Sequence, residues 1–318
     1  MNKTTMQKLL LTHEAMLALL LAITLVVLSF LSDSFLTTEN LLNQVRLMAE
    51  VGLIALAMTL VIVTGGIDLS VGSIAGLSAI VLGILWKNLG LPLPLAVVAA
   101  IAVGTLAGVA NGILITRFRL PPLIATLATM AFYRGLAEGL SQGRSVRGYP
   151  EWFYVFGQGS FLGVPTQVLI LAVAAVIFAV LLARTAFGRT VFAIGANETA
   201  ARFSSLNVDR VKVTVYGLSG LMSGLAGVIL VSRVTTTRSD MGMGWELDAI
   251  TAVVLGGASI FGGRGTVLGT VLALALVQCL KGGLSLAGVK ADGTIVLIGL
   301  FLIAAVLLGN LMDRIAAR

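Results

Sequence analysis

Few residues in this chain have a type and spacing that could do chemistry. Asp68 is the most informative, because it lies between two apolar stretches in the sequence GGIDLSVGS at 65–73. A carboxylate held centrally in hydrocarbon costs about 2.5–3.5 kcal/mol on insertion scales, so something must compensate for it. A helix expected over 69–86 would offer its N-terminal amide groups to Asp68 and Ser70. The pattern therefore favours a structural cap over an ion or substrate contact.

A second pair of charges lies within another apolar stretch. Arg134 and Glu138 are spaced i,i+4, so on a helix each charge can neutralise the other. Structural pairing is the leading interpretation here too. Five more polar residues lie within or at the ends of apolar stretches, and they form no acid–base pair of the kind used in catalysis: Asn111, Gln142, Glu246, Asp248 and Gln278.

The sequence contains no motif for nucleotide hydrolysis or for a catalytic metal. It has no Walker A sequence, dinucleotide fingerprint or HExxH, and its single cysteine and single histidine cannot make a paired site. The segment GGRGTVLG at 262–269 lacks the Gly-Lys-Ser/Thr ending of a phosphate loop. We therefore expect no catalytic site, metal or cofactor in this chain. Two mechanisms of transport across a membrane remain, one driven by an ion gradient and one driven by a separate ATPase. The near absence of deeply placed carboxylate pairs weighs against the ion gradient.

The elements that must position these residues are membrane-spanning helices. Of 318 residues, 58% are hydrophobic and 11% charged, whereas about a quarter of an ordinary soluble domain is charged. The charges separate apolar stretches long enough to cross a bilayer. We predict an all-α, polytopic membrane protein, a single transmembrane domain over 1–318 with about ten transmembrane helices. The expected spans are 15–31, 47–64, 68–86, 95–116, 121–142, 167–184, 212–232, 247–263, 265–283 and 293–312.

The distribution of basic residues predicts the orientation. The formal net charge of +7 indicates loops against an anionic cytoplasmic leaflet rather than binding of nucleic acid. Basic residues are densest in the loop at about 185–211 and also mark both ends of the chain. The positive-inside rule therefore places this loop and both termini in the cytoplasm.

Two loops are long enough to contact other proteins. The external loop at about 143–166 is rich in aromatic residues and glycine, which suits either an anchor at the lipid headgroups or a docking surface. Its candidate docking residues, with one from a later external segment, are Arg144, Arg147, Trp152 and Arg238. In the cytoplasmic loop, Asn197 followed by ETAARFSSL predicts an N-capped, short amphipathic helix on which another protein could push.

Glycine gathers in two places, 65–73 and 256–265, and both interrupt apolar stretches. Such breaks leave backbone groups unpaired, which hydrocarbon tolerates only where protein covers the break or a watery cavity adjoins it. The two segments are loosely similar, which indicates either a parallel internal repeat or chance similarity. The segment 247–265 either spans the membrane fully or is re-entrant. The candidate hinge or pathway residues are Gly65, Gly66, Asp68, Ser70, Gly72, Gly256, Gly257, Gly262 and Gly263.

Three segments together resemble the ABC-type sugar permeases of the ribose, xylose, galactose, rhamnose and autoinducer-2 importers. They are GGIDLSVGS, FGRTVFAIGANETAARFSSLNV at 187–208, and ELDAITAVVLGGASIFGGRGTVLG at 246–269. The resemblance implies a homodimeric or heterodimeric permease in the bacterial cytoplasmic membrane. It also implies two cytoplasmic subunits that hold ATP and Mg, a periplasmic or lipid-tethered substrate-binding protein, and contact with membrane lipid.

The same resemblance implies a coupling helix at 197–206, which would meet the ATPase. Its residues, with the glycine before it, are Gly195, Asn197, Glu198, Ala200, Ala201 and Arg202. The segment TTTRSDMGMGWELD at 235–248 departs from the ribose-type pattern towards the rhamnose and autoinducer-2 branches. Permeases for branched-chain amino acids or nucleosides are the nearest alternatives, and a gradient-driven carrier is the alternative from another class.

Overall fold

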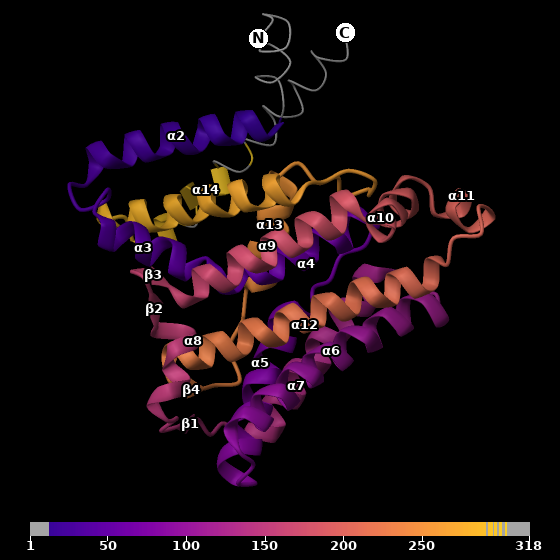
Figure 1. The fold of residues 1–318 in the computed structure, drawn as a ribbon, viewed down its shortest axis with the longest axis horizontal. Helices are drawn as coiled ribbons and strands as arrows, with labels where there is room; N and C mark the ends of the chain where they lie inside the picture. The colour runs from indigo at the N-terminus through magenta and orange to yellow at the C-terminus, as the bar shows by residue number, and fades with distance from the viewer. Residues whose placement is uncertain (1–12, 291, 295, 298, 301–302, 304–318) are drawn as a thin grey trace, which may run out of the picture.

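A computed structural model describes residues 13–290, 292–294, 296–297, 299–300 and 303. Its helices form a bundle in which the long helices run roughly side by side between two ends (Figure 1). These helices are α2 (His13–Leu31), α4 (Ala49–Val63), α6 (Leu93–Arg117), α9 (Thr166–Arg184), α12 (Val208–Val234) and α14 (Val267–Leu286). One end carries α10 (Ala186–Ala196) and α11 (Glu198–Phe203), and we call it the coupling end. The other end carries four two-residue strands, and we call it the strand end. The chain thus runs back and forth between the two ends.

The remaining elements complete this bundle. They are α3 (Thr38–Leu47), α5 (Val71–Gly83) with its π-helical continuation η1 (Ile84–Asn88), α7 (Pro122–Ser141) and α13 (Trp245–Leu255). At the strand end, β1 (Val146–Arg147) pairs antiparallel with β4 (Thr236–Thr237), and β2 (Ser160–Phe161) with β3 (Val164–Pro165). The turns η2 (Glu151–Tyr154) and α8 (Val155–Gln158) lie between β1 and β2.

Six of the described helices are long and apolar enough to cross a membrane, and a seventh span results if α3 and α4, bent by 46°, count as one. The all-α, polytopic prediction is confirmed at this level. The expected span 247–263 is wrong in extent, because α13 ends at Leu255 where Gly256 and Gly257 follow, the latter with φ +91°. The expected span 293–312 lies largely outside the described residues.

The core of the bundle is α4, whose residues are all buried except Val51. Its neighbours α9, α12, α13 and α14 enclose it. Against α12, the helix α6 packs through glycine: a Cβ on Gly108 would overlap the backbone at Tyr216 and Gly220. Small residues allow two helices to approach this closely in a membrane protein. The bundle is therefore built around one enclosed helix and one glycine-lined contact.

Candidate functional site

Asp68 is completely buried between α4 and α5, and hydroxyl groups surround it. Its Oδ1 accepts hydrogen bonds from the backbone N of Ser70 at 3.0 Å and from Ser70 Oγ at 2.6 Å. Its Oδ2 accepts a bond from Ser219 Oγ on α12 at 2.8 Å. The carboxylate therefore caps the turn into α5 and also ties this turn to α12.

The network around Asp68 continues into α6 and α7. Asn111 Nδ2 donates to Ser70 Oγ at 2.7 Å, and Tyr133 OH lies 3.3 Å from Asn111 Oδ1 and donates to Ala107 O at 2.9 Å. No ion pair to Asp68 occurs within the described part of the chain. Neutral donors from Ser70 and Ser219 therefore compensate for the buried acid, and α6 and α7 support Ser70 through Asn111 and Tyr133.

The two glycine-rich breaks meet at the end of α10. The backbone N of Gly263 donates to Val63 O at 2.9 Å, which joins the second break to the end of α4. Gly195 lies against both partners, since a Cβ on it would overlap Val63 O and Gly263 N. Gly65 and Gly262 adjoin the same place. We call this contact of Val63, Gly65, Gly195, Gly262 and Gly263 the glycine junction.

The other predicted hinge glycines lie elsewhere. A Cβ on Gly66 would overlap Tyr216 OH, and one on Gly72 would overlap Gly242 O of the segment before α13. Gly256 packs against Gly269, while Gly257 packs against His13, whose Nε2 lies 2.8 Å from Leu255 O. The predicted hinge residues thus divide among several close contacts and do not form one site.

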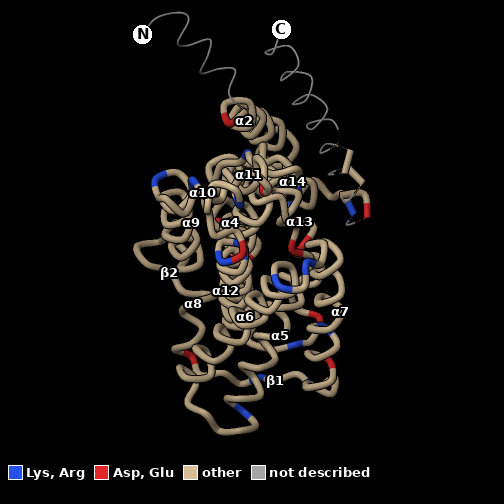
Figure 2. The backbone as a smooth tube through the Cα atoms, turned by 90° about the vertical axis from the view of Figure 1, so that its right-hand side faces the viewer, with Lys and Arg blue, Asp and Glu red and all other residues tan. Residues whose placement is uncertain are grey.

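The predicted short helix is present as α11. Asn197 Oδ1 accepts a hydrogen bond from Ala200 N at 2.9 Å and so caps the helix, as expected from the sequence. The helix covers Glu198–Phe203 and is shorter than the predicted 197–206. Ala201 is its buried residue. Figure 2 looks onto the coupling end and shows acidic and basic positions side by side where α12 begins.

Ion pairs fix α11 to the start of α12. Glu198 accepts bonds from Arg202 at 2.9 Å and from Lys212 at 2.5 Å, and Arg202 also pairs with Asp209 at 2.5 Å. Partial burial acts to raise the pKa of Glu198, but Lys212 and Arg202 outweigh it and hold that pKa below its ordinary value. The hydrogen bonds from Arg202 to Asp209 and Glu198 raise the pKa of Arg202. The network stays charged at neutral pH, and its contribution is lost only in acid, as pH falls through the lowered pKa of Glu198.

A cavity of about 730 Å³ adjoins this network at the coupling end. The end of α6 supplies Arg117 and the loop after it Arg119, and the network supplies Glu198, Arg202 and Lys212. Charged side chains of both signs therefore face one hollow, which an asymmetric polar surface of a second protein could fill.

The expected pairing of Arg134 with Glu138 is wrong as an ion pair. Arg134 Nη1 donates instead to the backbone oxygens of Met241, at 2.9 Å, and Ser239. Glu138 is exposed and forms no ion pair with any described residue. Arg134 reaches these carbonyls because the segment before α13 folds back onto α5 beside α7. Its role is to tie α7 to that segment.

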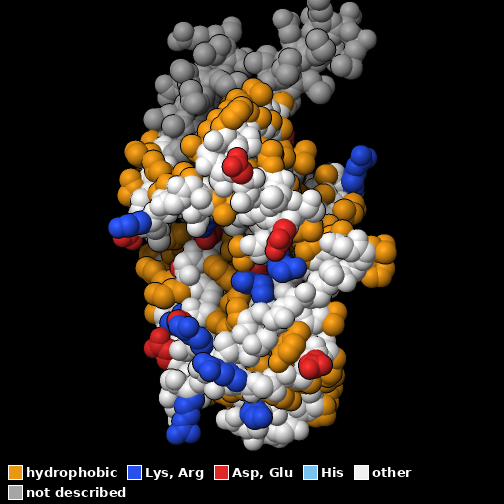
Figure 3. All heavy atoms as spheres, turned by 90° about the vertical axis from the view of Figure 1, so that its left-hand side faces the viewer, with side chains coloured by type: hydrophobic (Ala, Val, Ile, Leu, Met, Phe, Trp, Pro, Cys, Tyr) orange, Lys and Arg blue, Asp and Glu red, His pale blue; other side chains and the backbone are white. Residues whose placement is uncertain are grey.

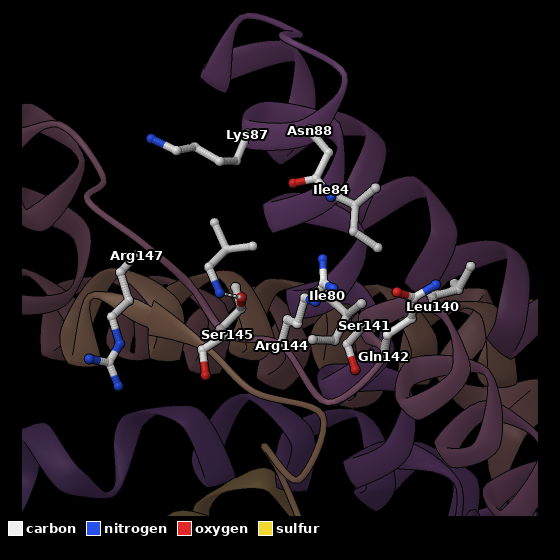
Figure 4. Close-up of a pocket in the computed structure, with 12 residues that line it drawn as sticks. Ile80, Ile84, Lys87, Asn88, Leu140, Ser141, Gln142, Arg144, Ser145 and Arg147 are labelled. Atoms are coloured by element: carbon white, nitrogen blue, oxygen red, sulfur yellow. Dashed lines mark hydrogen bonds between the residues drawn. The ribbon is translucent and has the colours of Figure 1, made fainter.

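The predicted docking residues lie at three places at the strand end. Arg144 and Arg147 line a cavity of about 480 Å³, which Lys87 and Asn88 close from the end of η1 (Figure 4). Trp152 is half exposed and packs edge-on against Phe153. Arg238 is exposed and pairs with Asp240. In the view of this end, most Lys and Arg side chains lie in its lower half (Figure 3).

Sequence reasoning missed several residues that pair or join sites in the folded chain. Glu50 on α4 is 1% exposed and pairs with Arg233 at the end of α12, 2.6 Å away. The tertiary fold also brings Lys212 to Glu198, Ser219 to Asp68, and Lys87 to the cavity of Arg144 and Arg147. An acid inside an apolar stretch is a detectable signal for Glu50, but its partner lies far along the chain.

These features define a class of protein: a multi-pass helical membrane protein with a buried polar break and a charged helix at one end. The chain belongs to the family described as "Branched-chain amino acid transport system / permease component", whose profile matches residues 40–306.

Among its curated relatives are import permeases for two solutes. The "Ribose import permease protein RbsC" of Bacillus subtilis is 45% identical over 291 residues, covering 91% of this chain and 90% of that protein. The "Autoinducer 2 import system permease protein LsrD" of Salmonella typhimurium is 39% identical over 299 residues, covering 92% and 90%. The RbsC of Escherichia coli K12 is 38% identical over 309 residues, covering 95% and 94%. The expected resemblance to sugar and autoinducer-2 import permeases is confirmed.

Proposed function

We propose that this chain is the membrane-spanning permease of an ATP-driven importer for a sugar or sugar-like solute of the ribose and autoinducer-2 type. It acts beside a second permease subunit in the bacterial cytoplasmic membrane, and both of its termini face the cytoplasm. Separate ATP-hydrolysing subunits, which carry ATP and Mg, bind the coupling end. A periplasmic or lipid-tethered binding protein delivers the solute at the strand end.

The observation that carries this proposal is the path of contacts from α11 to the polar break. Ion pairs hold α11 to α12, and α12 supplies Ser219 to Asp68. Directly before α11, Gly195 touches both glycine-rich breaks. A push on α11 therefore reaches the breaks through backbone contacts as well as through α12. Close-packed contacts of this kind pass on displacement because they cannot be compressed.

At the strand end, Arg144 and Arg147 with Lys87 form a cationic rim around one cavity. A binding protein with carboxylates at the matching place would be steered to this rim by charge complementarity. Trp152 adds an apolar contact beside it. This arrangement supports the docking surface over a lipid anchor alone.

The test is purification of the tagged chain from its native membrane, followed by uptake in proteoliposomes. The wild-type chain should retain an ATPase subunit and, with the binding protein, import solute only when ATP is supplied inside the vesicle. Glu198→Arg places a third cation against Lys212 and Arg202, so it should release the ATPase and abolish uptake. The matched control is Glu151→Arg, the same substitution at the strand end, which should keep the ATPase bound. Uptake driven by an ion gradient without ATP, or an unchanged Glu198→Arg variant, would contradict the proposal.

A further inference from the structure

A polar cavity of about 600 Å³ lies at the strand end between α3 and the end of α14. Residues of α3 and of the turn before it form its polar wall, and Leu286 of α14 forms an apolar edge. We call it the α3 pocket. It is separate from the glycine junction, the α11 network and the rim of Lys87, Arg144 and Arg147.

The α3 pocket is a built part of the fold. Asn40 Nδ2 donates to Phe35 O at 2.7 Å, and Gln44 Nε2 donates to Asn40 Oδ1 at 3.2 Å. Gln44 Oε1 in turn accepts a bond from Gln278 Nε2 of α14 at 2.9 Å. The amide side chains of this region are therefore used to fix α3 onto α14, and they hold the pocket's wall in place.

The two charged side chains of the pocket have no such partners. The side chain of Arg46 makes no hydrogen bond or ion pair with the described residues, and its Nε is buried without a partner. A dehydrated guanidinium N–H is costly to leave unpaired, and its planar fork of donors matches a phosphate. Glu39, on the same wall, is exposed and also unpaired among the described residues. One pocket thus presents a cation and a carboxylate that do not meet each other.

This pair of charges selects the chemistry of a ligand. A simple anion would be attracted by Arg46 but repelled by Glu39, and a simple amine would meet the reverse. A zwitterion with a phosphate and a primary ammonium a few ångströms apart satisfies both. Glu39 and Arg46 are seven residues apart on one helix, or roughly 10 Å along its axis at 1.5 Å per residue, a span that the two flexible side chains and such a headgroup can bridge.

The surroundings of the pocket indicate where this zwitterion comes from. Leu36 is 53% exposed, Leu47 37% and Leu286 43%, so apolar side chains open to the outside border the polar wall. The helix α3 is polar on one side and bends by 46° into the enclosed α4. Such a helix at the end of a membrane bundle lies at the level of the lipid headgroups. We propose that the α3 pocket binds the ethanolamine headgroup of a phospholipid, with Arg46 on the phosphate and Glu39 on the ammonium.

The experiment uses the full chain, delipidated in detergent and analysed by native mass spectrometry with one phospholipid class at a time. The wild-type chain should bind phosphatidylethanolamine in preference to phosphatidylglycerol and phosphatidylcholine of the same acyl chains. Arg46→Gln should weaken this binding by about tenfold or more, since a charged hydrogen bond is lost. Arg46→Lys, which keeps the charge without the fork, should fall between the two. Glu39→Gln should remove the preference over phosphatidylglycerol.

The controls separate headgroup recognition from other kinds of binding. Arg147→Gln removes an exposed cation at the same end and should leave lipid binding unchanged, and each variant is checked for an unchanged elution volume. Inorganic phosphate and glycerophosphoethanolamine test the soluble sources of the same chemistry. Equal binding of all three lipids, Arg46→Gln binding like wild type, or inorganic phosphate bound where the lipid is not, would each overturn the proposal. None of these readouts depends on transport, so they stand or fall separately from the proposed importer function.

Discussion

At the scale of single residues, the fold treats two buried acids in two ways. Asp68 has only neutral donors, whereas Glu50 has the guanidinium of Arg233 at 2.6 Å. Removing one partner of a buried ion pair commonly costs about 3–5 kcal/mol, because a charge is left uncompensated. A carboxylate held by hydroxyls is more forgiving, since a hydroxyl can rotate to donate or accept. Asp68 therefore has room to serve as an adjustable tie between α5 and α12.

The first prediction concerns Asp68. Asp68→Ala leaves Ser70 and Ser219 without their acceptor and should lower stability by about 1–3 kcal/mol for each buried group left unpaired. Asp68→Asn should cost less, because Ser219 Oγ can turn to accept from the new amide. Thermal unfolding of the detergent-solubilised protein measures both. If Asp68→Asn also keeps full uptake at normal membrane levels, the negative charge has no part in transport and Asp68 is a cap alone.

At the scale of elements, the glycine junction joins three parts of the chain through backbone atoms. The end of α4, the end of α10 and the second glycine-rich break approach so closely that only glycine fits at 195. A side chain there must push at least one of the three apart. Overpacking of a close contact costs about 1–3 kcal/mol. Adding one methyl group at position 195 therefore tests whether α4, α10 and the second glycine-rich break are coupled through this contact.

The second prediction follows from this contact. Gly195→Ala should reduce ATP-driven uptake by about tenfold or more, because a strain of 1–3 kcal/mol falls on the junction. ATPase association should survive, since the ion pairs of α11 are untouched. The control is Gly135→Ala on α7, where a Cβ has open space and a helix gains from alanine. Equal uptake by both variants would show that the junction does not take part in coupling.

Sequence reasoning predicted the local features of these elements and missed the distant ones. The cap at Asn197 follows from neighbours within three residues, so pattern alone predicted α11. The end of α13 was misplaced because ASIF and its flanking glycines are apolar without being helical, and hydropathy does not distinguish the two. Ser219, which joins Asp68 to α12, lies 151 residues away from it, and the two carbonyl acceptors of Arg134 lie 105 and 107 residues away. Only the packing of helices determines such pairs.

At the scale of the whole molecule, the alternation of the helices sorts the charges between two ends. Arg117, Arg184, Arg202 and Lys212 lie towards the coupling end, while Lys87, Arg144, Arg147 and Arg233 lie towards the strand end. The loop assigned to the cytoplasm and the loop assigned to the outside in the sequence analysis thus lie at opposite ends of the bundle. One orientation of the bundle in the membrane therefore determines on which side each of these loops lies.

The third prediction tests that direction. In a chain with Cys279→Ala, Ser204→Cys after α11 should react with a membrane-impermeant thiol reagent only in inverted vesicles. Ser145→Cys, near β1, should react only from the outside of intact cells or spheroplasts. Both serines are exposed, so burial does not limit the reaction. Labelling with the opposite sidedness would reverse the proposed orientation.

The enclosure of α4 has a consequence for how the chain is made. This helix is synthesised early, yet the surfaces that cover it belong to α9, α12, α13 and α14, which leave the ribosome later. Until these helices are inserted, α4 must contact lipid or the insertion machinery. Glu50 has no ion-pair partner until Arg233 has been translated. The centre of the protein is thus among the first parts inserted and the last to be finished, and chains truncated before α12 should be recognised as incomplete by membrane proteases.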